Sequence, residues 1–297
     1  LLIAEPRDDD RVVLANTDPA RYPDDAFAIG DELPRTKIPD WDAWTQARAQ
    51  ERRRAGRAGA WSDYVRSAVL YLQHLNTTDE GRFDPPLRGM NVVVHGLIPP
   101  VAGLSSSSAL VVAAAEACRH INGLPIADRD LVDVCGLAEW YIGTRGGSGD
   151  HSAIKFGRLG HIMHIGSHPF SVDWVPFPSD YVVVMANCGR KAEKSSAVRD
   201  MFNQLVSSYV IGFLMVRRRF PEMAPRLEHL RDLNPARLGV GEADIYRMLQ
   251  AVPERVTRGE ILRMLPDDRP ALERTFGSHA EPAGGYPLRG VCLYGVS

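Results

Sequence analysis

Residues 99–110 read PPVAGLSSSSAL, a turn-forming approach followed by one glycine, four consecutive serines and the start of an apolar run. The preceding residues 90–98 are rich in β-branched side chains and predict a strand, whereas residues 106–123 predict a helix that ends at a glycine. The first amide groups of a helix lack partners within the helix, and the helix dipole is positive there, so this end can hold an anion without a lysine. The pattern therefore favours a phosphate-binding loop, and a serine-rich helix cap without a ligand is the simpler alternative.

Three other motifs that bind phosphates or activate a serine do not fit this sequence. The P-loop pattern GxxxxGK[ST] does not occur, and residues 239–244, GVGEAD, do not match GxGxxG. Ser105 and Ser107 lack the second glycine of a GxSxG nucleophile elbow. The P-loop, dinucleotide-binding and serine-hydrolase interpretations are therefore excluded.

Hydrophobic periodicity divides the chain into two parts. In the first part, strands are predicted over residues 11–17 and 90–98, helices over 62–75, 106–123 and 126–142, and buried strands over 160–165 and 181–187. In the second part, helices are predicted over residues 195–219, 221–233, 242–251 and 258–265, and a final apolar strand over 290–296. We therefore expect an α+β protein of two domains, residues 1–180 and residues 181–297.

The composition of the chain excludes two classes of partner. The 35 Lys and Arg residues against 37 Asp and Glu give a net charge of −2, which supplies no overall attraction for nucleic acid. The basic run at residues 50–59, QERRRAGRAG, lacks aromatic side chains for base stacking and is interpreted as a solvated helix face and loop. The longest strongly apolar stretch, residues 209–216, is far shorter than the roughly 20 residues that span a bilayer. We expect neither a nucleic-acid nor a membrane partner.

The cysteines and the ends of the sequence give two further expectations. Cys118, Cys135, Cys188 and Cys292 are widely separated and form no CxxC pair, so they predict neither a zinc site nor a disulfide framework. Four free thiols are typical of a reducing cytoplasm. The sequence opens Leu-Leu-Ile without a methionine and stops within the predicted strand 290–296, so we expect a fragment of a longer protein.

Residues 99–110 resemble the second signature motif of the GHMP kinases, the family of galactokinase, homoserine kinase, mevalonate kinase and phosphomevalonate kinase. Further stretches resemble the galactokinase branch: residues 61–65 (WSDYV), Ala138-Glu139, the glycine-rich turn ending in Gly149-Asp150, and residues 157–165 (GRLGHIMHI). The resemblance implies a GHMP kinase fold with a ribosomal-S5-domain-2-like N-terminal domain and a ferredoxin-like, helix-rich C-terminal domain. It also implies that ATP and a sugar meet between these domains.

The same resemblance implies a role for each matched residue. Asp150 would face the sugar hydroxyl to be phosphorylated, where a carboxylate can orient that hydroxyl and take its proton. On spacing alone, Asp150 is equally well explained as a loop-stabilising residue beside a glycine. Gly146 and Gly147 would let the backbone approach the sugar, and Glu139 with Ser107 would hold Mg²⁺, which prefers oxygen ligands. The residues that would hold the ATP phosphates are Gly103, Leu104, Ser105, Ser106, Ser107 and Ser108.

Several residues depart from the galactokinase pattern and leave the identity of the sugar open. Residues 146–151 read GGSGDH in place of the usual Cys-Gly-Ile-Met-Asp-Gln, and Glu139 and Asp150 are one residue closer than usual. Phe202 stands where a tyrosine is common.

Three polar residues have no assigned role. His151, which replaces the usual glutamine, could contact Asp150 or be a surface or structurally bonded histidine. Lys191 and Lys194 could contact a phosphate or a sugar, or could form a solvated basic turn.

The function expected from the resemblance is ATP- and Mg²⁺-dependent phosphorylation of a monosaccharide hydroxyl. The anomeric C1 hydroxyl of galactose, or of a related sugar such as arabinose or a uronic acid, is the expected acceptor. Two alternatives stay open: a GHMP kinase acting on a non-sugar alcohol, and a galactokinase-like sensor that binds sugar and ATP without transfer. Because the first family motif would precede Leu1 and the third would follow Ser297, we expect this 297-residue piece alone to be weakly active or inactive.

Overall fold

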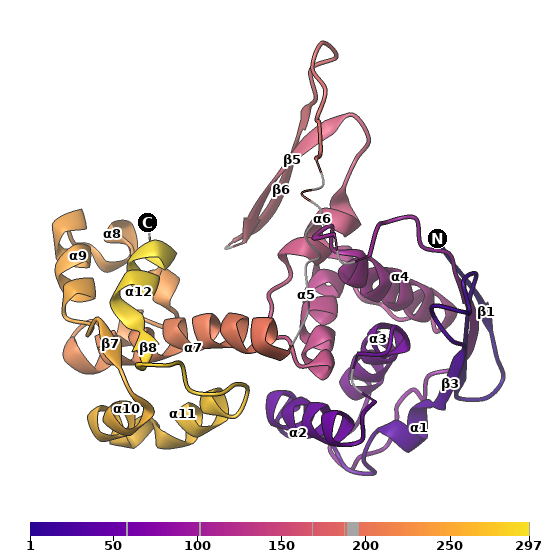
Figure 1. The fold of residues 1–297 in the computed structure, drawn as a ribbon, viewed down its shortest axis with the longest axis horizontal. Helices are drawn as coiled ribbons and strands as arrows, with labels where there is room; N and C mark the ends of the chain where they lie inside the picture. The colour runs from indigo at the N-terminus through magenta and orange to yellow at the C-terminus, as the bar shows by residue number, and fades with distance from the viewer. Residues whose placement is uncertain (58, 101, 168, 187, 189–195, 297) are drawn as a thin grey trace. The chain divides into compact units, whose positions relative to one another are not determined.

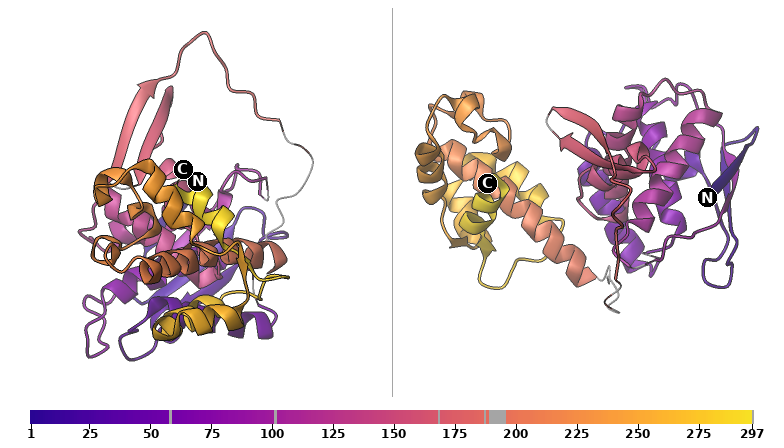
Figure 2. Two further views of the ribbon diagram at one scale, coloured as in Figure 1. Left: turned by 90° about the vertical axis from the view of Figure 1, so that its left-hand side faces the viewer. Right: turned by 90° about the horizontal axis from the view of Figure 1, so that it is seen from above.

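A computed structural model describes residues 1–57, 59–100, 102–167, 169–186, 188 and 196–296. The chain divides into two compact units, unit 1 over Leu1–Glu193 and unit 2 over Lys194–Ser297 (Figures 1 and 2). This division lies later in the chain than the domain boundary predicted at residue 180. Each unit has a hydrophobic core of its own.

Unit 1 contains a four-stranded sheet with the strand order β1-β4-β2-β3. The strands are β1 (Leu2–Pro6), β2 (Arg11–Asn16), β3 (Asp25–Ala28) and β4 (Met90–Val94). β2 and β4 run parallel, and the two outer strands pair antiparallel to them. Val12 and Leu14 are fully buried while Arg11 is exposed, so the sheet turns one face toward the core. The predicted strands near residues 11–17 and 90–98 are confirmed as β2 and β4.

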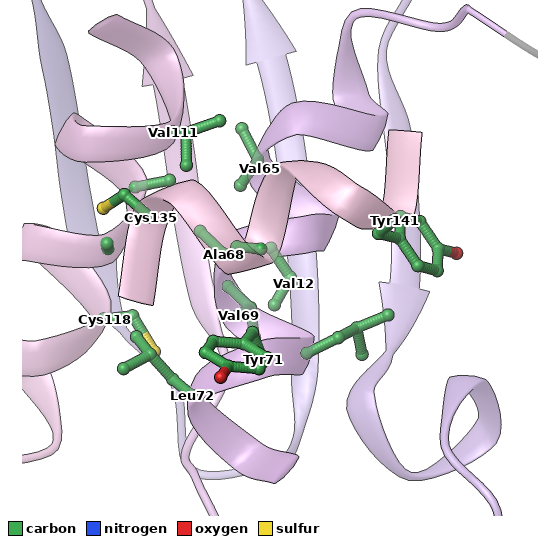
Figure 3. Close-up of a cluster of buried hydrophobic side chains, with 14 of the residues drawn as sticks. Val12, Val65, Ala68, Val69, Tyr71, Leu72, Val111, Cys118, Cys135 and Tyr141 are labelled. Atoms are coloured by element: carbon green, nitrogen blue, oxygen red, sulfur yellow. The ribbon is translucent and has the colours of Figure 1, made fainter. Parts of the chain in front are cut away.

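Helix α3 is the centre of the unit 1 core (Figure 3). Val65, Ala68, Val69, Leu70 and Leu72 of this helix have no exposed surface, which is the pattern of a helix surrounded by protein. The predicted helix over 62–75 is confirmed at both ends. The helices of unit 1 are α1 (Ile29–Glu32), α2 (Trp41–Arg54), α3 (Ser62–Leu75), α4 (Ser106–Ile121), α5 (Asp128–Ala138) and α6 (Gly149–Phe156).

The predicted helix over residues 126–142 consists of two segments. α5 ends at Ala138, and the chain continues as the tighter 3₁₀ turn η1 (Glu139–Ile142). Gly143 ends this turn in the left-handed region, at a φ of 96°, which glycine adopts without steric cost. Glu139 is therefore the first residue of a 3₁₀ turn and does not lie in the middle of a long helix.

The strands β5 (His161–Ser167) and β6 (Phe170–Pro176) form an antiparallel hairpin. Trp174 anchors the hairpin to α6, because its indole Nε1 donates to the Phe156 carbonyl at 2.9 Å. The strand predicted over 160–165 is confirmed, but its predicted burial is wrong, since Ile162 is 52% exposed. A two-stranded hairpin without a third strand leaves one face open to solvent.

The buried strand predicted over residues 181–187 is wrong for the described residues 181–186. These residues have no strand pairing, and Tyr181, Val182, Val183, Val184 and Met185 are between 66% and 84% exposed. A run of β-branched residues predicts the extended backbone, but a strand also needs a neighbour to satisfy its amides and carbonyls. Asn187, Lys191 and Lys194 lie outside the described residues.

Unit 2 is almost entirely helical in its described residues. Its helices are α7 (Ser196–Arg219), α8 (Pro235–Leu238), α9 (Glu242–Gln250), α10 (Arg258–Met264), α11 (Arg269–Phe276) and α12 (Leu288–Val296), with 3₁₀ turns η2 (Ala224–Arg226), η3 (Leu230–Asp232) and η4 (Pro266–Asp268). β7 (Arg255–Val256) and β8 (Tyr286–Pro287) form a short antiparallel pair. Helices predicted near 195–219, 242–251 and 258–265 are confirmed as α7, α9 and α10.

Two predictions in unit 2 are wrong. Residues 221–233 form the turns η2 and η3 rather than one helix, because Pro225 lacks an amide hydrogen and disfavours helical backbone at the residue before it. Residues 290–296 belong to helix α12 rather than to a strand. Leu288 and Cys292 are buried one helical turn apart, and Gly212 of α7 makes room for Cys292, whose Sγ would lie 2.1 Å from an added Cβ.

Within the described residues, no helix is both long and apolar enough to cross a bilayer.

Candidate functional site

The serine loop enters helix α4 through two residues with left-handed backbone. Gly103 has a φ of 73°, and Ser105, the residue before the helix, has φ 52° and ψ 36°. A left-handed conformation is costly for a residue with a side chain, and such strain is often found at functional loops. Ser105 does not cap the helix, because its side chain makes no hydrogen bond to the first helical amides. The amino end of α4 is therefore not capped by this hydroxyl.

The Ser105 hydroxyl instead contacts the predicted catalytic residue. Its Oγ donates to Oδ2 of Asp150 over 2.7 Å. Asp150 lies in the first turn of α6, is exposed, and is separated from Ser105 by 45 residues of sequence. The fold thus places the predicted catalytic carboxylate beside the loop that is predicted to hold phosphates.

A second hydrogen bond connects the first turn of α4 to Glu139. The Ser108 hydroxyl donates to Oε1 of Glu139 over 3.0 Å. Ser108 is 4% exposed and the Glu139 side chain 14% exposed, so this contact lies beneath the surface. Ser107, which the resemblance pairs with Glu139 as a metal ligand, lies next to Ser108 in the first turn of α4.

The residues near Glu139 fit a magnesium ion that is bound together with phosphates. The described residues contain no cluster of three or more His, Cys, Asp or Glu side chains that could hold a metal. Mg²⁺ commonly takes one or two protein oxygens and completes its shell with phosphate oxygens and water. Glu139, with the serine hydroxyls beside it, provides this kind of sparse oxygen site.

His151 follows Asp150 on α6 and is turned into the protein. Its side chain is 2% exposed, and its Nε2 lies 3.5 Å from Oε1 of Glu139. His151 is therefore a buried residue close to Glu139, and the surface interpretation of this histidine is wrong.

The glycine loop before α6 is held by an arginine that the sequence analysis did not single out. The Arg145 side chain is 8% exposed, and its Nε lies 2.6 Å from Oδ1 of Asp42 on α2. The same guanidinium donates to the Trp140 carbonyl at 2.9 Å. Burial lowers the pKa of Arg145 from its ordinary value, and the nearby Asp42 carboxylate opposes this effect. In the sequence, the feature that could have indicated this anchor is an arginine next to the glycine-rich turn at residues 146–149.

The two predicted sugar-facing glycines leave open space. A Cβ added at Gly146 or Gly147 would meet no atom within 4 Å. Neither glycine is therefore required by packing within the chain, and both leave room for a ligand to approach the backbone.

Cysteine chemistry is not a feature of this region. Burial raises the pKa of Cys118 and of Cys135 to about 12, so both thiols stay protonated near neutral pH. All four cysteines are free thiols.

Comparison with known proteins identifies the region that carries these contacts. Residues 63–158 match the GHMP kinases N terminal domain. This segment contains the serine loop, Glu139, the glycine loop and Asp150. Over this segment the chain is similar to the GHMP kinases, and the relatives that it resembles include galactokinases. The matching segment is therefore the part of the chain in which the amino ends of α4 and α6 and Glu139 come together.

Several galactokinases are similar to this chain. It is 30% identical to the galactokinase of Haemophilus influenzae strain PittGG over 128 residues, which cover 43% of this chain and 32% of that protein. It is 28% identical to the galactokinase of Candida parapsilosis over 218 residues, which cover 70% of this chain and 38% of that protein. The chain thus spans about a third of the length of these relatives.

A solved structure, that of Lactococcus lactis galactokinase complexed with galactose, also matches this chain. The TM-score is 0.48 at 20% identity, and the match covers 92% of this chain and 62% of the other.

Proposed function

We propose that the protein to which this chain belongs is a sugar kinase that transfers a phosphoryl group from ATP to a monosaccharide hydroxyl. The hydrogen bond from Ser105 Oγ to Asp150 Oδ2, 2.7 Å long, carries this proposal. Phosphoryl transfer requires an acceptor hydroxyl in line with the terminal phosphate, and this contact places a carboxylate beside the amino end of α4. The galactokinase relatives support the choice of a sugar as acceptor.

The residues of the serine loop would bind the phosphate chain. Amides at the amino end of α4, with the backbone of residues 103–108, would donate to phosphate oxygens. Small side chains in this loop would let the backbone close around the anion. Glu139 and a serine hydroxyl would hold Mg²⁺, which supplies charge neutralisation on the phosphates when bound.

Asp150 would act on the acceptor. Its exposed carboxylate would accept a hydrogen bond from the sugar hydroxyl, orient that oxygen toward the phosphate, and take the proton as the new bond forms. Gly146 and Gly147 would let the sugar lie against the backbone, because no side chain fills this space. The proposed acceptor is the anomeric C1 hydroxyl of galactose or of a related aldose or uronic acid.

The proposed location is the cytoplasm. All four cysteines are free thiols, which a reducing compartment would preserve.

Binding is the first test of this proposal. Isothermal titration of the full-length gene product, with the 297-residue chain beside it, would use a non-hydrolysable ATP analogue with Mg²⁺ and then a panel of aldoses and uronic acids. We expect the analogue to bind and one sugar to bind in its presence. If the full-length protein binds no nucleotide, the kinase proposal is withdrawn. Selective binding of a non-sugar alcohol would instead indicate a kinase of another GHMP branch.

Turnover of the full-length protein tests the role of Asp150. Asp150→Asn is expected to lower kcat by a factor of about 10² to 10⁴, because the amide cannot accept the hydroxyl proton. Asp173→Asn is the matched control, since this side chain is 74% exposed on the hairpin. Equal kcat in the wild type and in Asp150→Asn would contradict the assignment, and sugar and nucleotide binding without turnover in the wild type would indicate a sensor.

A further inference from the structure

His151 is a buried polar residue whose hydrogen-bonding capacity is unused. The residue is 2% exposed, and within the described part of the chain neither Nδ1 nor Nε2 has a hydrogen-bond partner. A buried imidazole gives up its bonds to water, so an unpaired one destabilises the folded state unless another role accounts for it. Packing alone would be served better by an apolar side chain of similar size.

The surroundings of His151 indicate what that role is. Its Nε2 lies 3.5 Å from Oε1 of Glu139, slightly beyond hydrogen-bond distance. Oε1 is also the oxygen that accepts from the Ser108 hydroxyl at 3.0 Å. Two donor-bearing groups from two helices, α4 and α6, therefore approach the same oxygen of one carboxylate.

This arrangement has the form of an outer shell around a metal-binding carboxylate. A carboxylate that binds a metal is commonly held by hydrogen bonds from neighbours that do not touch the metal. Holding Oε1 in this way would keep Oε2 for the metal. His151 itself is a poor ligand for Mg²⁺, which prefers oxygen donors.

We propose that His151 is a positioning residue that orients the Glu139 carboxylate for a magnesium–nucleotide complex by donating from Nε2 to Oε1. This inference rests on the proposed kinase function. The shift required is small, because the two atoms are already 3.5 Å apart. His151 directly follows Asp150 on α6. One helical turn would therefore carry both the carboxylate that faces the sugar hydroxyl and the histidine that positions the metal-binding Glu139.

Two variants of the full-length protein separate positioning from packing. His151→Leu fills the space without a donor, and His151→Gln keeps an N–H donor on a flexible side chain. Titration of the non-hydrolysable ATP analogue at increasing Mg²⁺ would give the concentration that half-saturates binding, and thermal unfolding of the unliganded variants would report stability. We expect His151→Leu to raise that Mg²⁺ concentration about tenfold without lowering the unfolding temperature, and His151→Gln to restore it.

The outcomes distinguish this inference from the function on which it rests. If the wild type binds the magnesium–nucleotide complex and His151→Leu binds it equally well, the positioning role is overturned and the kinase proposal stands. If His151→Leu and His151→Gln are weakened equally and both unfold at lower temperature, the residue is structural and the inference is also overturned. If the wild type binds no magnesium–nucleotide complex, both proposals fail together.

Discussion

Ser105 combines a strained backbone conformation with a side-chain contact to Asp150 in the candidate site. Its left-handed backbone directs the chain into α4, while its hydroxyl reaches Asp150 rather than the helix amides. A serine here supplies a donor that glycine lacks, and it does so at a conformational cost that glycine avoids. Ser105 therefore lowers the stability of the folded chain but supplies a polar contact between the serine loop and α6.

Two substitutions at Ser105 measure this strain. Both Ser105→Gly and Ser105→Ala remove the hydroxyl, but only alanine keeps a Cβ in the left-handed region, so Ser105→Ala should be less stable by about 1 kcal/mol. Urea unfolding followed by tryptophan fluorescence measures the difference, because all five tryptophans lie in unit 1. Equal stabilities of the two variants would show that the backbone at residue 105 carries no strain.

At the level of single residues, the sequence could indicate candidate residues but not their contacts. Four consecutive serines after a glycine exceed what a helix cap requires, whereas Asp150 was singled out by the family resemblance. The bond from Ser108 to Glu139 and the anchor from Arg145 to Asp42 depend on how helices distant in sequence pack. No pattern within one segment carries that information.

At the level of elements, the predictions that succeeded were amphipathic or buried helices with clear ends. α3 was predictable because it opens with a serine, a residue type common at helix starts, and continues with apolar residues at helical spacing, and α4 because a glycine follows it. Three predictions failed for a shared reason: the strand over 181–187, tested for residues 181–186, the burial of the strand over 160–165, and the strand over 290–296. A short apolar run predicts burial or extension, but the packing partner decides whether either occurs.

Residues 181–186 consequently give a prediction about solubility. Five consecutive apolar side chains are exposed there without strand pairing, a combination that favours association between chains. Val183→Lys should reduce aggregation on concentration and leave the unfolding temperature unchanged, because this side chain is already 72% exposed. Light scattering measures the first effect and calorimetry the second.

A matched control for Val183→Lys is Leu159→Lys. Leu159 is fully exposed before β5 and outside the apolar run, and its substitution adds the same charge. An equal gain in solubility from both variants would assign the effect to net charge rather than to residues 181–186.

At the scale of the whole chain, the two units can be compared by the polar side chains that they bury. Both units bury polar side chains beside an apolar cluster, and in unit 2 these side chains form a network around a histidine, His279. In that network, His279 Nε2 lies 2.8 Å from the Tyr286 hydroxyl, and Arg258 Nε donates to the same hydroxyl at 3.0 Å. Ser278 Oγ is 2.8 Å from the other ring nitrogen of His279. Polar contacts of this kind fix the relative positions of α10, α11 and β8.

The buried His279 predicts that acid destabilises unit 2, and in unit 1 burial also lowers the pKa of His74. Burial first, and then the positive charge of Arg258, lower the pKa of His279 from 6.5 to about 4, although Asp200 opposes the shift. The unfolded state therefore binds a proton between these two values and the folded state does not. The stability due to neutral His279 is complete above about pH 6.5 and is lost as the pH falls toward 4, by at most about 3 kcal/mol. We expect the thermal transition of unit 2 to move down over this range.

The distribution of tryptophans makes the effect on each unit measurable. Tryptophan fluorescence reports unit 1 alone, whereas far-ultraviolet circular dichroism reports both units and unit 2 is mostly helical. Lowering the pH from 7 to 5 should shift the dichroism transition more than the fluorescence transition. His279→Asn, which keeps polar contacts but does not titrate, should remove most of this difference. A shift of the dichroism transition that is as large in His279→Asn as in the wild type would contradict the role of His279.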